Sequence, residues 1–184
     1  MSNTNPCRAV LRYPGSKWRL AQHLCEYIPE HHSYLEPYFG SGAVFFTKPP
    51  SAIETIKDLD LDVVNLFSCL RNDPNKLASM IYATPYARYI YDQQFVGQTY
   101  DDPYEKALSF LIKCWMGHGY RTNGYKVGWK NDVQGREHAY SLLNWQKLPA
   151  WVLQAAERLK QAQIECMPAT DLIRRFDYEN VFMY

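Results

Sequence analysis

The stretch YLEPYFGSGAVFF at residues 34–46 constrains the fold more than any other part of this sequence. A short apolar segment over 34–36 predicts a strand, two glycines follow with G-x-G spacing, and a helix is predicted over 43–47. A second strand is predicted over 54–59 and a helix over 61–70. Because a helix lies between two strands, the pattern predicts a βαβ unit and therefore an α/β fold with a parallel sheet.

The two ends of the chain are predicted to build this sheet, with a mostly helical insertion between them. Ser16 is expected to cap an early helix, Pro149 to lie in the first turn of a late one, and 117–138 to form a binding loop or hairpin. Further helices are predicted over 17–28, from Pro74, and over 85–95, 103–116, 149–161 and 169–176, and further strands over 164–167 and 181–184. The expected parts are a cofactor-binding α/β part over 1–70, a target-recognition insertion over 71–148 and a return to the sheet over 149–184.

Composition narrows the class of protein. The formal net charge of +1 provides no overall attraction to nucleic acid, although residues 1–25 are basic without acidic side chains and 113–137 has a basic excess. The five cysteines contain no C-x-x-C pair, and no apolar run has membrane length. The adjacent His31 and His32 would point in different directions on a helix or strand. We therefore expect a cytoplasmic protein with reduced thiols, no membrane partner and no metal.

The G-x-G turn has the chemistry of a nucleoside site. Glycines let a ligand approach the backbone, and a carboxylate roughly 20 residues further on is the usual acceptor for ribose hydroxyls. Asp58 occupies that place. The third glycine of the dinucleotide fingerprint is absent, since Phe45 and Phe46 follow, which favours a ligand without a pyrophosphate, such as S-adenosylmethionine. A plain strand-to-helix turn is the alternative for this motif taken alone.

An earlier motif, LRYPGSKWRL at 11–20, adds to this interpretation. Lys17 is a plausible partner for a ligand carboxylate, and Tyr13 for an apolar or cationic face. In this order, RYPGSK, LEPYFGSG and KDLD (57–60) resemble the motifs of the Dam-type, or D12 class, DNA adenine methyltransferases. The departures are small: Pro14 and Ser16 flank a single glycine, and Asp60 replaces the usual asparagine.

The resemblance implies a Rossmann-like sheet that binds S-adenosylmethionine, and it assigns roles residue by residue. Tyr13 and Lys17 would contact the methionine part of the cofactor, and Asp58 its ribose. Asp171 would lie near the adenine of the cofactor, although a helix N-cap explains this residue equally well. The cofactor loop would be formed by Glu36, Pro37, Phe39, Gly40 and Gly42.

The insertion would recognise double-stranded DNA. Segment 117–137 resembles the Arg/Asn-Gly loop of that region in the family. Arginine pairs bidentately with guanine and asparagine with adenine, so Arg121 or Asn123 could read base edges, while other basic groups would meet phosphates. The DNA-binding residues implied are Arg121, Asn123, Lys126, Lys130 and Arg136.

Catalysis in this family depends on an Asp-Pro-Pro-Tyr motif, which does not occur in these 184 residues. Asp101-Asp102-Pro103-Tyr104 is similar, but Asp102 is better explained as a helix N-cap with Pro103 in the first turn. The predicted strand over 181–184 resembles the strand upstream of the motif. We therefore expect a C-terminally truncated chain, with no catalytic residue assigned and no activity alone.

Two alternatives remain at this stage. One is a non-enzymatic remnant that binds S-adenosylmethionine or DNA without methyl transfer. The other is a nicotinamide-dependent oxidoreductase that uses the same G-x-G turn, which the missing glycine and the RYPGSK motif disfavour.

Overall fold

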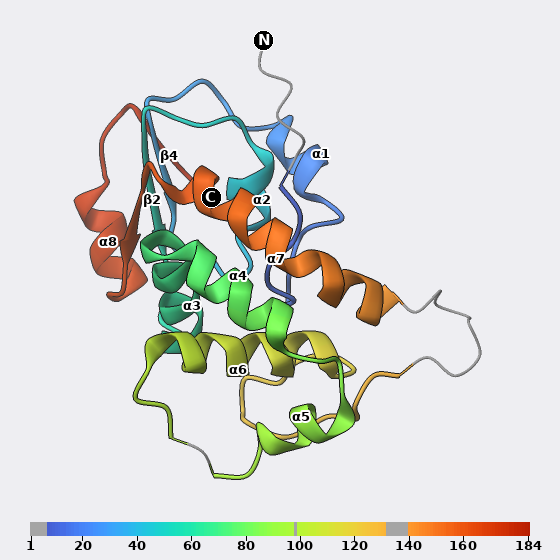
Figure 1. The fold of residues 1–184 in the computed structure, drawn as a ribbon. Helices are drawn as coiled ribbons and strands as arrows, with labels where there is room; N and C mark the ends of the chain where they lie inside the picture. Colours follow the sequence, from blue (N-terminus) through green and yellow to red (C-terminus); the bar gives the residue numbers. More distant parts are fainter. Residues whose placement is uncertain (1–6, 98, 132–139) are drawn as a thin grey trace.

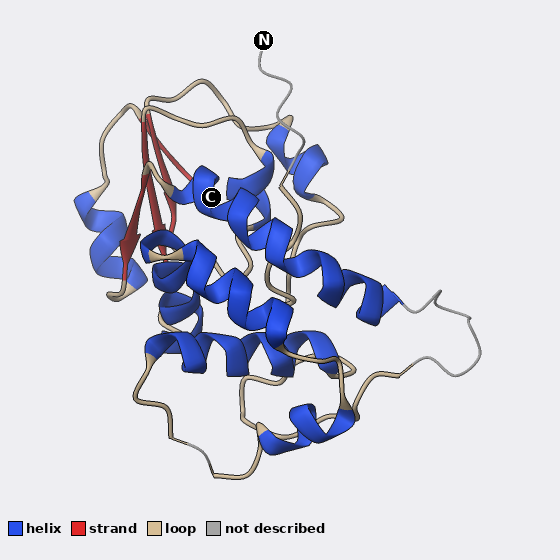
Figure 2. Ribbon diagram, in the orientation of Figure 1, coloured by secondary structure: helices blue, strands red, loops and turns tan. Residues whose placement is uncertain are grey.

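A parallel sheet forms the frame of the molecule (Figures 1 and 2). The computed structural model describes residues 7–97, 99–131 and 140–184. Four strands, all parallel, lie in the order β3-β2-β1-β4. Their bounds are Ser33–Glu36 for β1, Ile53–Lys57 for β2, Ala162–Glu165 for β3 and Val181–Met183 for β4. The predicted α/β class and parallel sheet are confirmed.

Helices cover both faces of this sheet. Figure 2 shows α8 (Ala169–Arg175) on one side and α2 (Ala43–Thr47) with α7 (Tyr140–Leu159) on the other. The other helices are α1 (Ala21–Cys25), α3 (Leu61–Asn72), α4 (Pro74–Ala83), α5 (Arg88–Gln93) and α6 (Pro103–Met116). Since β1 and β2 are interior strands, they carry a nearly continuous run of buried residues rather than an alternating pattern.

Capping explains where the middle helices begin. Asp73 accepts a hydrogen bond from the Lys76 backbone nitrogen at the start of α4. Asp102 accepts one from the Tyr104 nitrogen at the start of α6, and Pro103 occupies the first turn. The predicted N-cap role of Asp102 is confirmed.

Two of the predicted helix starts, at Ser16 and at Pro149, were wrong. The helix expected over 17–28 is reduced to α1, with Leu20 at its N-cap, because Ser16 directs its Oγ to Ser41 Oγ at 2.8 Å instead of capping a helix. Pro149 does not open a helix but lies inside α7, which contains the predicted 148/149 boundary. Pro149 has no N–H for the carbonyl four residues earlier, and the burial of Leu148 and Val152 offsets this loss.

A buried ion cluster joins the sheet to its covering helices. Glu54, in the interior strand β2, lies 2.6 Å from Lys48 Nζ through its Oε1. Arg158 of α7 donates to both carboxylate oxygens of Glu54, with Nη2 at 2.7 Å from Oε1, and to the Phe45 carbonyl oxygen at 3.2 Å. The Glu54 side chain is fully buried, and these two cations offset the free-energy cost of removing its negative charge from water.

Glu36, at the end of β1, is a second buried carboxyl group. The Tyr34 hydroxyl donates to its Oε2 at 2.6 Å, and only 2% of the residue is exposed. Burial raises the pKa of Glu36 to about 8, with the hydrogen bonds from Tyr34 and the Phe45 backbone acting in the opposite direction. Glu36 is therefore neutral in the folded protein below that pH.

Replacing Arg158 with methionine should lower the free energy of unfolding by about 3 kcal/mol, because it leaves Glu54 with only one of its two cations. Urea unfolding followed by circular dichroism measures this. The matched control is Lys160→Met, which removes an exposed pair with Glu157 and should cost about 0.5 kcal/mol. Equal losses in the two variants would contradict the assigned role of the cluster.

The neutral Glu36 should make stability depend on pH. Its pKa rises from 4.5 to about 8 on folding, so its stabilising contribution is complete below about 4.5 and is lost as pH rises through about 8. Relative to Glu36→Gln, the free energy of unfolding of the wild type should fall by up to about 1.4 kcal/mol per pH unit across this interval. A difference between the two proteins that stays constant from pH 5 to 9 would refute this.

Candidate cofactor and nucleic-acid site

The carboxyl ends of β1 and β2 bring the glycine loop beside Asp58. Asp58 accepts a hydrogen bond from the Gly40 nitrogen at 2.7 Å and one from the Asp60 nitrogen at 2.9 Å, through different carboxylate oxygens. The Phe39 nitrogen donates to the Lys57 carbonyl at 2.9 Å. Asp58 therefore connects the turn after β1 with the turn after β2.

The glycines are required by this geometry. Gly40 and Gly42 have φ of +50° and +65°, in the left-handed region that favours glycine. A Cβ on Gly42 would lie 2.4 Å from the ring of Phe39, and one on Gly40 would lie 3.3 Å from the ring of Tyr13. The loop consequently presents bare backbone at the edge of the sheet.

The N-terminal motif packs on this loop. The Tyr13 hydroxyl donates to Asp60 Oδ2 at 2.8 Å, and Ser16 meets Ser41. Burial, followed by the hydrogen bond to Asp60, raises the pKa of Tyr13 above its ordinary value. Lys17 is exposed, with Nζ 2.6 Å from the Gly15 carbonyl. The RYPGSK, glycine-loop and KDLD motifs, separate in the sequence, thus form one surface.

A cavity of about 790 Å³ adjoins that surface. Residues 9–20 supply most of its lining, and Gly119 and Tyr120 supply the rest. Its volume is in the range of small-molecule sites. The cavity therefore lies between the N-terminal motif and the loop that follows α6.

The other proposed cofactor residues lie in different surroundings. The side chain of Phe39 is buried edge-to-face against Phe67, with ring centroids 4.8 Å apart, and Pro37 and Glu36 are also buried. Asp171 is exposed in the first turn of α8, with Oδ1 3.6 Å from Arg174 Nη1. The N-cap interpretation of Asp171 was wrong, because Pro168 occupies that position.

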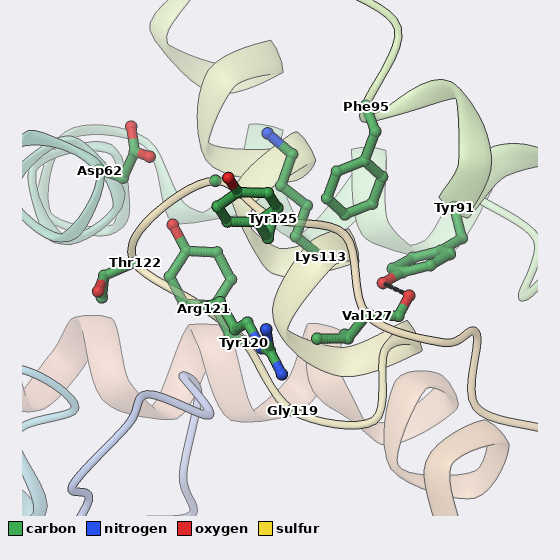
Figure 3. A pocket seen from close by; sticks show the side chains of 11 residues that line it. Asp62, Tyr91, Phe95, Lys113, Gly119, Tyr120, Arg121, Thr122, Tyr125 and Val127 are labelled. Atoms are coloured by element: carbon green, nitrogen blue, oxygen red, sulfur yellow. Dashed lines mark hydrogen bonds between the residues drawn. The ribbon is translucent and has the colours of Figure 1, made fainter.

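The segment after α6 is a hairpin-like loop, defined here as the 117–130 loop. Gly117 and Trp129 form an antiparallel bridge, the Lys130 nitrogen donates to the Met116 carbonyl, and the His118 nitrogen to the Gly128 carbonyl. The second half of the loop is held by two tyrosines, because the Tyr86 hydroxyl donates to the Lys130 carbonyl and the Tyr91 hydroxyl to the Val127 carbonyl (Figure 3). The expected hairpin is confirmed for this part.

The predicted DNA-binding residues are spread along this loop. Arg121 and Asn123 are exposed at the tip, where Asn123 Oδ1 accepts from the Tyr125 nitrogen at 3.2 Å. Lys126 Nζ is paired with Asp92 Oδ1 at 2.7 Å. Lys130 lies in the paired stem, and Arg136 lies outside the described residues.

Sequence reasoning missed Tyr120. Its ring centroid lies 6.2 Å from that of Tyr13 and 5.2 Å from that of Phe110, so it links the 117–130 loop to the N-terminal motif. Burial raises the pKa of Tyr120. No sequence pattern identifies such a residue, because the contact joins segments about a hundred positions apart.

Comparison with known proteins finds similar sequences among DNA adenine methyltransferases. The DNA N-6-adenine-methyltransferase of Escherichia phage P1 is 26% identical over 111 residues, covering 57% of this chain and 14% of that protein. The DNA adenine methylase of Serratia marcescens is 27% identical over 120 residues, covering 60% and 43%. A type II methyltransferase of Lactococcus lactis subsp. cremoris is 27% identical over 75 residues, covering 40% and 26%.

In each case the matched stretch is less than half of the relative. Within the described residues, every helix is too short or too polar to cross a bilayer. The sequence model of the family of D12 class N6 adenine-specific DNA methyltransferases matches residues 13–184 of this chain. The chain therefore belongs to the D12 class of N6 adenine-specific DNA methyltransferases.

Proposed function

We propose that this chain is the cofactor-binding and target-recognition part of an enzyme that transfers a methyl group from S-adenosylmethionine to the exocyclic amine of adenine in double-stranded DNA. The observation that carries the proposal is a set of three hydrogen bonds. The backbone nitrogens of Gly40 and Asp60 donate to the Asp58 carboxylate, and the Tyr13 hydroxyl donates to the Asp60 carboxylate. They gather the three family motifs at the carboxyl edge of the sheet, where ligands of open α/β sheets bind.

The residues at this edge fit the cofactor chemically. Each carboxylate oxygen of Asp58 accepts one hydrogen bond from a backbone nitrogen. A carboxylate oxygen has further lone pairs, which could accept hydrogen bonds from ribose hydroxyls. The bare backbone of Gly40 and Gly42 lets a nucleoside approach closely. Lys17 is exposed and would meet the carboxylate of the methionine part, and the face of Tyr13 would lie near its cationic sulfur.

The remaining proposed residues would act around this centre. The glycine loop would be supported by three buried residues, Glu36, Pro37 and Phe39. Asp171, which is exposed on α8, would contact the adenine of the cofactor. When bound, S-adenosylmethionine supplies a methyl group on a sulfonium. The role of this chain is to bind and orient that group, which is the positional part of catalysis.

The 117–130 loop would contact DNA. Arg121 and Asn123 are exposed at its tip and can reach base edges, whereas Lys126 is partly neutralised by Asp92 and would serve a phosphate. Lys130 would contact a phosphate from the stem, and Arg136 is assigned the same role by its sequence alone. Residues 71–148 would form the recognition part, between cofactor-binding residues 1–70 and sheet residues 149–184.

We further propose that these 184 residues bind without transferring a methyl group. They contain no Asp-Pro-Pro-Tyr motif, and the similar Asp102-Pro103-Tyr104 begins α6, where Asp102 is engaged as its cap and with Lys76 Nζ at 2.8 Å.

Isothermal titration should show S-adenosylmethionine binding that depends on Asp58. Asp58→Asn removes the charge and one acceptor, so the dissociation constant should rise by about 10- to 100-fold, since a hydrogen bond to a charged group contributes roughly 1.5–3 kcal/mol. The matched control is Asp101→Asn at an exposed position, which should bind as the wild type does.

Equal affinity in the Asp58 variant and the wild type would overturn the assigned site. Adding duplex DNA and radiolabelled cofactor to the same preparation tests the second proposal. We expect no label in the DNA, and label transfer would contradict binding without transfer.

A further inference from the structure

Lys57, the last residue of β2, is a buried lysine at the carboxyl edge of the sheet. Only 2% of the residue is exposed. A lysine normally buries its aliphatic stem and keeps its ammonium group in water, so a residue this enclosed usually has a partner for its charge. Within the described residues, no carboxylate lies at ion-pair distance from Lys57 Nζ and no acceptor is hydrogen-bonded to it. That part of the chain therefore leaves a buried ammonium group without a polar partner.

The ammonium group lies at the rim of the sheet rather than deep in the core. Lys57 Nζ is 5.4 Å from the ring centroid of Tyr38, which belongs to the turn after β1 and is 73% exposed. A tyrosine face attracts a cation at this distance. Because the ring belongs to an exposed residue, the contact brings Nζ to a place that a ligand can reach.

The Lys57 side chain lies on the face of the sheet that α8 covers. Glu54 points to the opposite face, where Arg158 of α7 binds it, and residues an odd number of positions apart in a strand point to opposite faces. Figure 2 shows α8 on the side of the sheet away from α7. Lys57 therefore shares its side of the sheet with Asp171, which is exposed in the first turn of α8.

The groups around this end of β2 complement one another chemically. The Asp58 nitrogen donates to the carbonyl of Glu165, the last residue of β3, at 3.4 Å, so the ends of the two strands are held together. Ionised Asp58 and Asp171 can accept hydrogen bonds but cannot donate them. Adenine carries an exocyclic amine, which donates, and ring nitrogens, which accept. Lys57 supplies the donor that the two carboxylates lack.

We propose that Lys57 Nζ donates a hydrogen bond to a ring nitrogen of the adenine of S-adenosylmethionine. The inference rests on the proposed function, since it takes Asp58 as the ribose contact and Asp171 as the contact of the adenine amine. The cofactor would provide the acceptor that the ammonium group lacks in the free chain. Lys57 would then strengthen cofactor binding without stabilising the free protein, because an unpaired buried charge is unfavourable.

Isothermal titration with S-adenosylhomocysteine, which has the same adenosine part, tests the contact. Lys57→Met removes the ammonium group and keeps an unbranched side chain, so the dissociation constant should rise about tenfold or more. The matched control is Lys160→Met at an exposed position, which should bind as the wild type does.

Three deaza analogues of this ligand, in each of which a CH group replaces one acceptor nitrogen of the adenine ring, identify the partner of Lys57. One analogue should bind the wild type about tenfold more weakly than the parent ligand does, and Lys57→Met should not weaken it further, because the same hydrogen bond is lost only once. Thermal unfolding of the free chain should occur at the same temperature in Lys57→Met as in the wild type, or at a higher one.

The remaining outcomes separate this inference from the proposed function. Affinity that depends on Asp58 but not on Lys57 would overturn the inference and leave the proposed cofactor site standing, whereas affinity that depends on neither would overturn both. A loss of affinity that is equal for all analogues and accompanied by a lower unfolding temperature would assign Lys57 a structural role and overturn the inference. Binding of inorganic phosphate that depends on Lys57, with cofactor affinity that does not, would assign the ammonium group to an anion and overturn the adenine contact.

Discussion

The charge of Glu54 in the interior strand β2 is the constraint on which the rest of the structure depends. A carboxylate enclosed by neighbouring strands and helices is tolerated only when cations reach it. Lys48 follows α2 directly, and Arg158 comes from α7. The cluster therefore fixes two helices to the sheet: the short helix α2, whose N-cap is Gly42, and the long helix α7. Arg158 also holds the Phe45 carbonyl within α2.

With α2 held in this way, the turn before it has little freedom. Gly40 can donate to Asp58 because the loop returns along the carboxyl end of β2, and Tyr13 can cover the loop because Gly40 has no side chain. Tyr120 then connects this surface to the 117–130 loop. The proposed cofactor edge and the proposed DNA loop are thus neighbours through the rings of Tyr13 and Tyr120, which both line the cavity beside the N-terminal motif.

The sequence predicted what short-range chemistry determines. The helix over 43–47 and the cap at Asp102 were predicted with their observed positions, because a glycine turn and an Asp-Pro pair act within a few residues. Ser16 and Pro149 were misjudged because tertiary contacts overrode local preference: Ser41 takes the Ser16 hydroxyl, and core burial holds Pro149 inside a helix. The contacts of Asp60 and Tyr120 needed the fold, since their partners come from distant segments.

The central claim is that S-adenosylmethionine binds where Asp58 connects the two turns. Two-dimensional amide NMR of the 184-residue chain during a titration with the cofactor tests it most directly. The account predicts that the largest shift changes fall on the amides of Gly40, Gly42 and Asp60, with those of α6 unchanged. Saturable binding that leaves these three amides unmoved, or no change anywhere at millimolar cofactor, would contradict it.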